Sequence, residues 1–258
     1  MPPRPPCRAF APVTTLCVAL VLLLTLAQTP SWADDLSDFN AAIEKVASHN
    51  RVAIGYLRTD NADLADVEIG RLKTAWTDVV IRFSTRPPQA MQDNPRYQQT
   101  LAGVQKSIND AAVLMNTSKT SANMIGPPHN DLARNSLQAI REQLSTLRKA
   151  SKITVLADCV LDANAAFASF FTFEYTAPDF SKPDVPNRAN ALGAIIKRCD
   201  EIAEPAVRAN PEFRRLIDGT MNALSFVPKL METRDRDMLQ RIIGEMRAFD
   251  NLLSFRFG

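Results

Sequence analysis

The chain has little glycine, little histidine and none of the short motifs that mark the common enzyme classes. Its 258 residues include 8 glycines and 2 histidines. A glycine-rich phosphate loop, a Gly-x-Ser-x-Gly elbow and a His-Glu-x-x-His helix are all missing from the sequence. Two histidines are too few for a histidine-rich metal site within one chain, and neither has a glutamate three residues before it. No group of residues therefore favours an enzyme, and we expect a non-catalytic protein.

The N-terminal segment 1–33 has the pattern of a secretory signal peptide. Two arginines precede an apolar stretch from Leu16 to Ala27, and the small residues Ser31 and Ala33 occupy positions −3 and −1 of a cleavage site after Ala33. The apolar stretch is shorter than the roughly 20 residues that a membrane span needs. We predict a cleaved leader and a mature protein in the periplasm or outside the cell, with no membrane span after cleavage. An uncleaved anchor starting near Ala9 is the alternative.

The mature chain carries no net charge. The whole sequence has 30 basic and 28 acidic residues, and Arg4 and Arg8 belong to the leader, so 28 of each sign remain. A nucleic-acid-binding protein would show a basic excess or a basic stripe interleaved with aromatic residues. We therefore expect no nucleic-acid partner.

Apolar residues recur at alternating intervals of three and four, which is the period of an amphipathic helix. No window shows the two-residue alternation and glycine-containing turns that are typical of strands. The sequence therefore predicts an all-α fold. The expected helices span residues 35–59, 62–85, 95–117, 130–150, 153–176, 187–208, 211–231 and 234–255.

An internal repeat relates the two halves of the chain at an offset of 116 residues. An Asn-Pro pair opens a helix at position 94 and again at 210, Gly103 matches Gly219, and Leu-Met at 114 matches Leu-Met at 230. Asparagine is a good helix cap, and proline is tolerated in the first turn because its missing N–H has no helical partner there. The matches indicate a duplication. We predict two tandem up-down-up-down four-helix units, 34–151 and 152–258.

The connection between the two units lacks any obvious helix breaker. Neither glycine nor proline occurs from Asn130 to Ala177, so the last helix of the first unit could continue directly into the first helix of the second. The β-branched segment 153–155 is the expected place for a bend. A second bend is expected at Pro228, because a proline inside a helix removes a hydrogen bond and clashes with the preceding turn.

One group of polar residues in the first unit is a candidate ligand site. Asn50 occupies a core-facing position beside His49, and Tyr56 and Arg58 follow along the same helix. These four side chains could surround a small ligand or a metal, with Met115 or Met91 as a soft partner. The pattern favours the simpler interpretation, a half-exposed histidine beside an asparagine that sets the helix register.

Five aromatic residues lie within nine positions, more than one helix face can bury in its own unit. Phe171, Phe173 and Tyr175 must point away from the face that carries Phe167 and Phe170. The favoured interpretation is that they pack against the other unit. The rival is an exposed patch for self-association, an unknown protein partner or a flat ligand.

Two cysteines remain after the leader, Cys159 and Cys199, and both fall on inward faces of neighbouring helices. In an oxidising compartment they could form a disulfide that closes a loop of 40 residues; two buried, unbridged cysteines are the alternative. On the first of these helices, Asp158 and Asp162 share a face with Ser151 and Ser169. That pattern favours a solvated acidic stripe over an acid–base pair.

An exported chain built from four-helix units with few histidines resembles the periplasmic bundle class of cytochromes b562 and c′. The resemblance covers architecture and compartment. The c′ type carries Cys-x-x-Cys-His on its last helix, and the b562 type uses a first-helix methionine and a last-helix histidine. None of these motifs is present, so no haem ligand is carried over and the cofactor is unknown. We expect a binding or interaction module, or alternatively a small-ligand, haem or metal-binding bundle of electron-transfer or sensor type.

Overall fold

The computed structural model describes residues 32–120, 127–175 and 184–258, and in these segments every regular element is a helix. The predicted all-α fold is therefore confirmed. Most of the predicted leader, residues 1–31, lies outside the described residues. No helix in the described part has the length and apolar character needed to cross a membrane.

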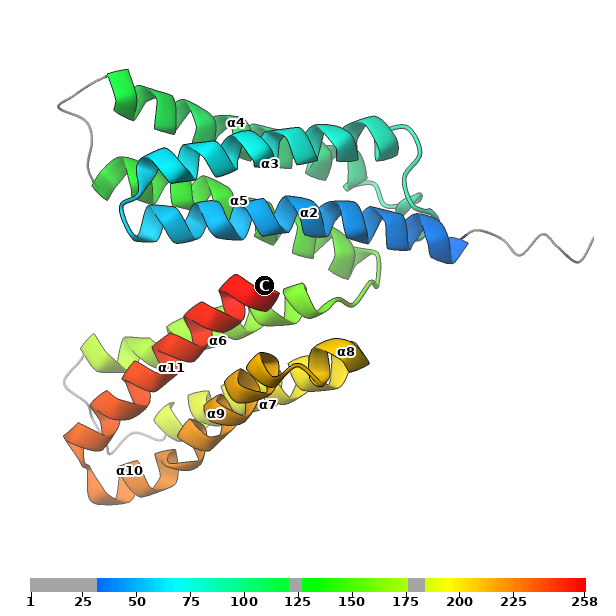
Figure 1. Cartoon of the computed structure of the whole chain (residues 1–258). Coiled ribbons are helices and arrows are strands. Elements are labelled where there is room, and N and C mark those ends of the chain that lie inside the picture. The colour runs from blue at the N-terminus through cyan, green and yellow to red at the C-terminus, as the bar shows by residue number, and fades with distance from the viewer. Residues whose placement is uncertain (1–31, 121–126, 176–183) are drawn as a thin grey trace, which may run out of the picture.

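Four long helices form what we call the N-terminal set, as the upper part of Figure 1 shows. Helix α2 packs against α3 and α5, and α4 packs against the same two neighbours. A short 3-10 helix, η1, follows α3 and contacts α2. The bounds are α2 Trp32–Arg58, α3 Ala62–Phe83, η1 Gln89–Met91, α4 Tyr97–Thr120 and α5 Pro127–Ala150.

The remaining helices form the C-terminal set, the lower part of Figure 1. Helix α6 packs against α7 and α11, and α9 packs against the same two neighbours. The bounds are α6 Leu156–Tyr175, α7 Asp184–Ile202, α8 Pro205–Arg208, α9 Pro211–Ser225, α10 Val227–Thr233 and α11 Arg236–Phe257.

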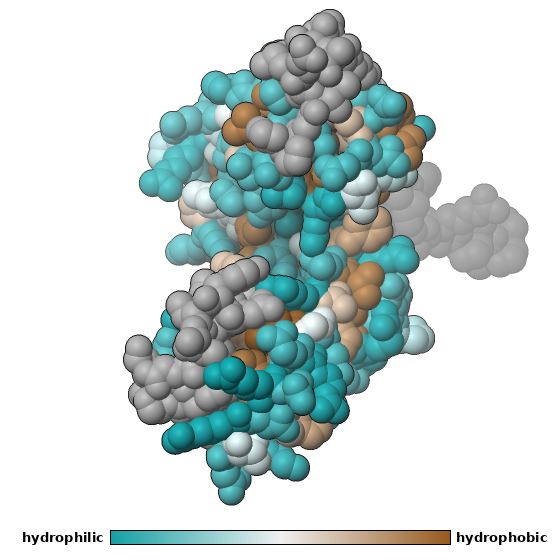
Figure 2. Space-filling view, turned by 90° about the vertical axis from the view of Figure 1, so that its left-hand side faces the viewer, coloured by the Kyte–Doolittle hydropathy of each residue, from teal (hydrophilic) through white to brown (hydrophobic). Residues whose placement is uncertain are grey.

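The buried apolar side chains fall into two clusters, one within each set. Trp76, Phe39 and Leu137 are among the fully buried residues of the first cluster, and Phe167 and Phe213 of the second. Figure 2 shows one face of the molecule, on which hydrophilic residues predominate and hydrophobic ones appear in small groups. This is the surface expected when each helix turns its apolar stripe toward its own cluster.

Proline divides two of the expected helices. Pro228 would clash with the carbonyl of the residue four positions earlier, so α9 ends at Ser225 and α10 begins at Val227. The predicted bend at Pro228 is therefore confirmed. The expected helix 187–208 ends early, at Ile202, and Pro205 begins the short helix α8.

The continuous helix expected across the two halves is wrong. Helix α5 stops at Ala150 and α6 starts at Leu156. Lys152 adopts the left-handed conformation, with φ 58°. Its N–H donates to Lys149 O at 3.1 Å, and the N–H of Ile153 donates to Arg148 O at 2.9 Å. This is the hydrogen-bond pattern of a Schellman helix end, made here without the usual glycine.

We predict that Lys152→Gly stabilises the protein. A left-handed residue with a side chain costs about 1–2 kcal/mol, and glycine removes that cost while losing part of the gain to the entropy of the unfolded chain. The free energy of unfolding in urea should rise by about 0.5–1 kcal/mol. The matched control Lys73→Gly, at an exposed position inside α3, should lower it by about 1 kcal/mol. Equal losses in both variants would contradict the helix end described above.

Candidate functional site: a cavity between the two helical sets

One candidate site is a cavity of about 730 Å³ between the N-terminal and C-terminal sets. Helices α2 and α5 form one wall, and α6, the end of α11 and the segment after α7 form the other. Figure 1 shows these elements facing one another where the two sets meet. Apolar side chains make up much of the lining: Ala41, Ile43, Ala47, Ile140, Leu144, Val155, Leu156, Ala157, Leu161, Ile202, Val207 and Phe257.

Four arginines also line this cavity, and three of them are paired with a carboxylate. Arg148 pairs with Asp158. Arg51 lies 2.6 Å from Glu44 Oε1 and donates to the Gly258 carbonyl at 2.6 Å. Arg256 Nε lies 3.2 Å from Glu212 Oε1. In these three cases most of the guanidinium charge is compensated within the protein.

Arg141 is the fourth arginine, and its hydrogen-bond partners are neutral. Nη1 donates to Gln138 Oε1 at 3.2 Å and to Ser254 Oγ at 3.3 Å, and Nη2 donates to Asn164 Oδ1 at 3.2 Å. Among the described residues, no carboxylate oxygen lies within 4.0 Å of this guanidinium. Burial, and then the positive charge of Arg51, lower the pKa of Arg141 to about 10. Arg141 thus remains a cation at neutral pH.

A polar network connects Arg141 to helix α11. Asn164 Oδ1 accepts from Arg141 and from Ser254 Oγ, the latter at 2.8 Å, and Asn164 Nδ2 donates to Asp250 Oδ1. Burial raises the pKa of Asp250 to about 6, although the hydrogen bond from Asn164 and the charges of Arg58 and Arg141 act in the opposite direction. Asn164 therefore stands between the Arg141 cation and the nearest acid of α11.

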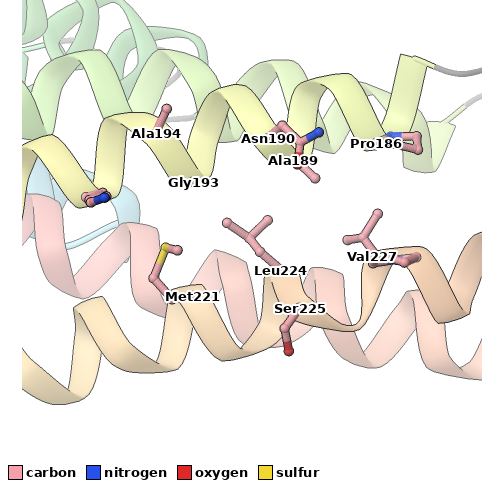
Figure 3. Close-up of a pocket in the computed structure, with 11 residues that line it drawn as sticks. Pro186, Ala189, Asn190, Gly193, Ala194, Met221, Leu224, Ser225 and Val227 are labelled. Atoms are coloured by element: carbon pink, nitrogen blue, oxygen red, sulfur yellow. The ribbon is translucent and has the colours of Figure 1, made fainter.

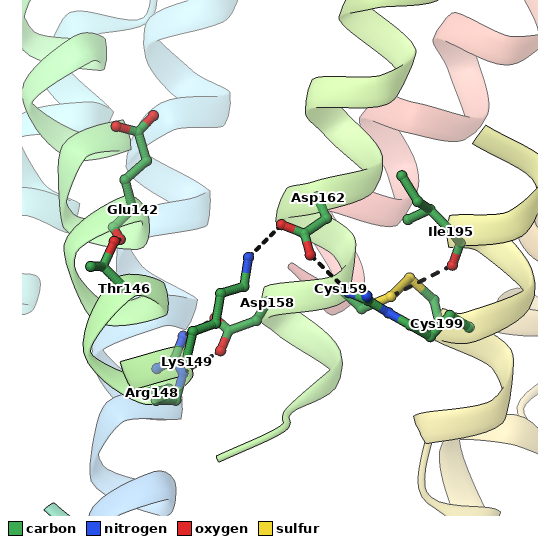
Figure 4. Close-up of polar contacts among 10 residues, drawn as sticks. Glu142, Thr146, Arg148, Lys149, Asp158, Cys159, Asp162, Ile195 and Cys199 are labelled. Carbon is green, nitrogen blue, oxygen red and sulfur yellow. Dashed lines mark hydrogen bonds and ion pairs between the residues drawn. A yellow bond between two sulfur atoms is a disulfide. The ribbon is translucent and has the colours of Figure 1, made fainter. Parts of the chain in front are cut away.

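The short connection between α5 and α6 holds one side of the cavity. Arg148 Nε and Nη2 donate to the two carboxylate oxygens of Asp158, at 2.9 and 2.5 Å, and both side chains are only 7% exposed. Asp162 accepts from Lys149 at 2.5 Å and from Arg198 at 2.8 Å. Figure 4 shows these contacts running from α5 through α6 to α7.

The solvated acidic stripe predicted for α6 is therefore wrong for Asp158, which is 5% exposed. The helical pattern of α6 alone cannot reveal the arginine that approaches from α5. The sulfur atoms of Cys159 and Cys199 lie at disulfide distance, 2.17 Å, with 5.5 Å between their Cα atoms (Figure 4). Of the two alternatives for this pair, the structure supports the bridge.

The polar residues predicted to surround a ligand with His49 form hydrogen bonds with partners on three different helices. His49 Nδ1 lies 2.8 Å from Glu68 Oε2 of α3. Asn50 is 1% exposed and donates to Leu137 O of α5 at 3.1 Å, and Arg58 donates to Asn251 of α11.

Tyr56 packs partly buried against the first cluster, and Met115 is 1% exposed within it. Of the predicted ligand residues, Asn50 alone lines the cavity between the two sets. Its Oδ1 is buried and has no hydrogen-bond partner among the described residues. Within the described ranges, no group of three His, Cys, Asp or Glu side chains is placed to hold a metal ion.

The side chains of the predicted aromatic patch, Phe171, Phe173 and Tyr175, lie outside the described residues. Phe167 and Phe170 of the same helix are fully buried, as the helical pattern predicts.

A second, smaller hollow of about 450 Å³ lies between α7 and the α9–α10 segment. Figure 3 shows Gly193 opposite Met221 and Leu224, where the missing side chain of glycine leaves room between the helices. The lining is mostly small or apolar: Pro186, Ala189, Asn190, Gly193, Ala194, Lys197, Met221, Leu224, Ser225, Val227 and Pro228. It brings together fewer charged groups than the larger cavity.

Sequence reasoning missed two of the arginines that line this cavity, Arg51 and Arg141. Each directly follows a predicted core position, Asn50 and Ile140, so each stands at the edge of an apolar stripe. A place at the edge of an apolar stripe is the only sign in the sequence that these arginines line a cavity. Many surface arginines that lie over apolar residues share this place, so it does not single these two out.

Comparison with models of protein families gives no significant match, and neither do comparisons with curated proteins and with solved structures.

We predict that removing one member of the buried ion pair is costly. Arg148→Met leaves the Asp158 carboxylate buried without a cation, which should lower the free energy of unfolding by about 3–5 kcal/mol. Replacing both partners, as Arg148→Met with Asp158→Leu, should restore most of this loss because no charge then remains buried. Urea unfolding measures both variants. A loss below about 1 kcal/mol for the single variant would mean that the pair behaves like an exposed one.

We also predict a pH-dependent effect of Asp250→Asn. The folded protein holds the Asp250 proton more tightly than the unfolded chain, so the contribution of this group to stability is present at low pH and is lost as pH rises through about 6. The asparagine cannot ionise and can still accept from Asn164. Its melting temperature should therefore exceed that of the wild type at pH 8 and approach it near pH 4. A less stable variant at pH 8 would contradict the burial of this carboxylate.

Proposed function

We propose that this chain is an exported, non-catalytic binding protein whose ligand site is the cavity between the two helical sets. The observation that carries the proposal is the combination of an apolar lining with Arg141, a cation whose protein partners are neutral, and Asn50, whose buried oxygen lacks a partner. Ligand sites are typically clefts of about 300–1,000 Å³ with apolar walls and a few convergent polar groups. The cavity has this size and composition.

The polar groups of this cavity are suited to holding a ligand. Guanidinium and carboxamide groups bind and orient through hydrogen bonds and do not exchange protons near neutral pH. Of the acidic lining residues, Glu44 and Asp158 are each paired with an arginine, and Glu204 is exposed to solvent. Binding without catalysis is the simplest activity for this set of side chains.

Export is supported by the leader pattern of residues 1–33 and by the placement of Cys159 and Cys199. A cysteine pair at bonding distance is typical of proteins that fold in an oxidising compartment. We place the mature protein in the periplasm or outside the cell.

We further propose that the two sets are four-helix units that arose by duplication. The matched glycines support this idea. A Cβ at Gly103 of α4 would come within 2.2 Å of Gln143 of α5, and one at Gly219 of α9 would come within 2.6 Å of Phe249 of α11. In both sets the repeated glycine therefore lets a side chain of the last long helix pass close to the backbone.

The turns that precede the same two helices agree with this proposal, although α9 begins directly after Asn210 and α4 begins three residues after Asn94, at Tyr97. The Asn210 side chain accepts from the N–H groups of Glu212 and Phe213, and the Asn94 side chain accepts from the N–H of Arg96. On this interpretation the ligand site is a product of the duplication, since it lies where one copy faces the other.

A thermal-shift screen tests the proposed site. Small anionic, neutral and cationic compounds, each below 1,000 Å³ in volume, are added to the mature protein. A ligand at about 100 times its Kd should raise the melting temperature by about 5–10 °C. Ala47→Phe, which fills the cavity from α2, should weaken that ligand about tenfold or more. The control Ala102→Phe, at an exposed position of α4, should leave binding unchanged. If no compound shifts the melting temperature, or if Ala47→Phe binds as the wild type does, the proposed site is wrong.

A further inference from the structure

We infer that the ligand of this cavity is an amphipathic carboxylate carrying a hydrogen-bond donor such as a hydroxyl group, with its carboxylate bound by Arg141 beside Arg51. The inference rests on the proposed function and names the chemical class of its ligand. It is argued from the donors that Arg141 retains, from the charge around it, from the apolar walls and from the unpartnered oxygen of Asn50.

Arg141 keeps the donors that a carboxylate would use. A guanidinium has five N–H groups, and three hydrogen bonds from Arg141 are made, two from Nη1 and one from Nη2. Nε and the second N–H of Nη2 are left, and Gly258 lies close to Nη2, since a Cβ built on this glycine would come within 2.6 Å of that atom. Arg148 uses the same two nitrogens, Nε and Nη2, to hold both oxygens of Asp158 in this structure. Arg141 thus retains the donor pair for a bidentate contact.

The contacts that Arg141 does make hold it in place. Gln138 comes from its own helix, Ser254 from α11 and Asn164 from α6, so three helices fix the guanidinium. Burial of this cation is costly; the charges of Asp250, Glu142 and Asp158 favour it, but none of these carboxylates forms a direct ion pair with it, and neutral oxygens compensate only part of the lost hydration. Arg51 increases that cost, because its charge acts against that of Arg141. An anion in the cavity would be attracted by both arginines.

The rest of the lining argues against a small inorganic anion. Ile43, Ala47, Leu144, Leu161 and Phe257 surround the polar groups, and a phosphate or sulfate would leave these surfaces without a partner. An aliphatic or aromatic body attached to the carboxylate would contact them instead and gain from leaving water. The ligand therefore carries an apolar part.

Asn50 supplies the second polar contact. Its side-chain nitrogen donates to Leu137 O, which orients the carboxamide and leaves Oδ1 as a buried acceptor without a partner. A buried acceptor without a hydrogen-bond partner lowers the stability of a protein by about 1–3 kcal/mol in mutational data. A hydroxyl group on the ligand would satisfy it. Recognition would then join Asn50 and Arg51 of α2 to Arg141 of α5.

Calorimetry with a set of matched probes tests whether the cavity prefers a negatively charged head group. Octanoate, octan-1-ol and octylamine share one apolar chain and differ in the head group. The wild-type protein should bind octanoate about ten- to a hundredfold more tightly than octan-1-ol, as expected for charge-assisted hydrogen bonds. Octylamine should bind most weakly, because its charge is repelled by both arginines. Equal binding of octanoate and octan-1-ol would overturn the inference.

Variants then assign the contact to Arg141. Arg141→Gln should weaken octanoate about tenfold or more and leave octan-1-ol within twofold. The matched control Arg82→Gln removes an arginine of α3 that lies outside the cavity lining and is paired with Asp38, so octanoate should bind as in the wild type. If Arg141→Gln does not fold, Arg141→Lys keeps the charge and should bind octanoate at intermediate strength. Unchanged octanoate binding in the folded Arg141 variants would mean that Gly258 and the neutral oxygens already satisfy this arginine, and the inference would fail.

The role of Asn50 is read from a second comparison. 3-Hydroxyoctanoate should bind the wild type more tightly than octanoate, and Asn50→Leu should bind the two compounds equally. The same preference in both proteins would overturn the assignment of the hydroxyl group. Binding of octan-1-ol in the cavity without any preference for octanoate would refute the carboxylate and keep the proposed site. Failure of every probe here and of the wider screen would refute both.

Discussion

Arg148 and Asp158 form a buried bidentate ion pair across the five residues that separate α5 from α6, and the arrangement of the two helical sets depends on it. The left-handed Lys152 turns the chain back, and the ion pair fixes the last turn of α5 against the first turn of α6. Asp162 and the sulfur pair of Cys159 and Cys199 extend the connection to α7. The direction in which the C-terminal set leaves the N-terminal set is therefore determined within about one helical turn on either side of Lys152.

Buried ion pairs add little to stability, because the loss of hydration offsets most of the attraction, and their best-attested use is to select one arrangement among several. The polar contact between the two sets is of this kind, because it selects one arrangement of the sets and adds little to stability. Each set buries its own apolar cluster, whereas Arg141, Asn164 and Asp250 join the sets through hydrogen bonds. Polar side chains need specific hydrogen-bond geometry, so they do not rearrange to close a hollow as apolar side chains would. A hollow between the sets is compatible with such an interface, where a continuous apolar contact would have closed it.

Most of the helices could be predicted from the sequence, because each depends on neighbours three and four residues apart. Errors arose where a local rule was overridden from elsewhere. The helix end at Lys152 lacks the glycine that usually marks it, and therefore the expected continuous helix from α5 into α6 was wrong. Asp158 lies on a face that looks polar from α6 alone, and only the position of α5 makes it buried. Of the predicted ligand residues, Asn50 lines the cavity, while His49 and Arg58 are engaged with Glu68 and Asn251.

The sequence by itself determined the helical class, the apolar face of each helix, the cap at Asn210 and the two cysteines that could meet. These features follow from hydrogen bonding and burial along one short stretch of chain. Tertiary structure alone decided that Asn50, Arg51 and Arg141 would line one cavity, with Asn164 bonded to Arg141 behind it. Such a meeting depends on the angle between packed helices. That angle results from many side chains acting together, and no single segment encodes it.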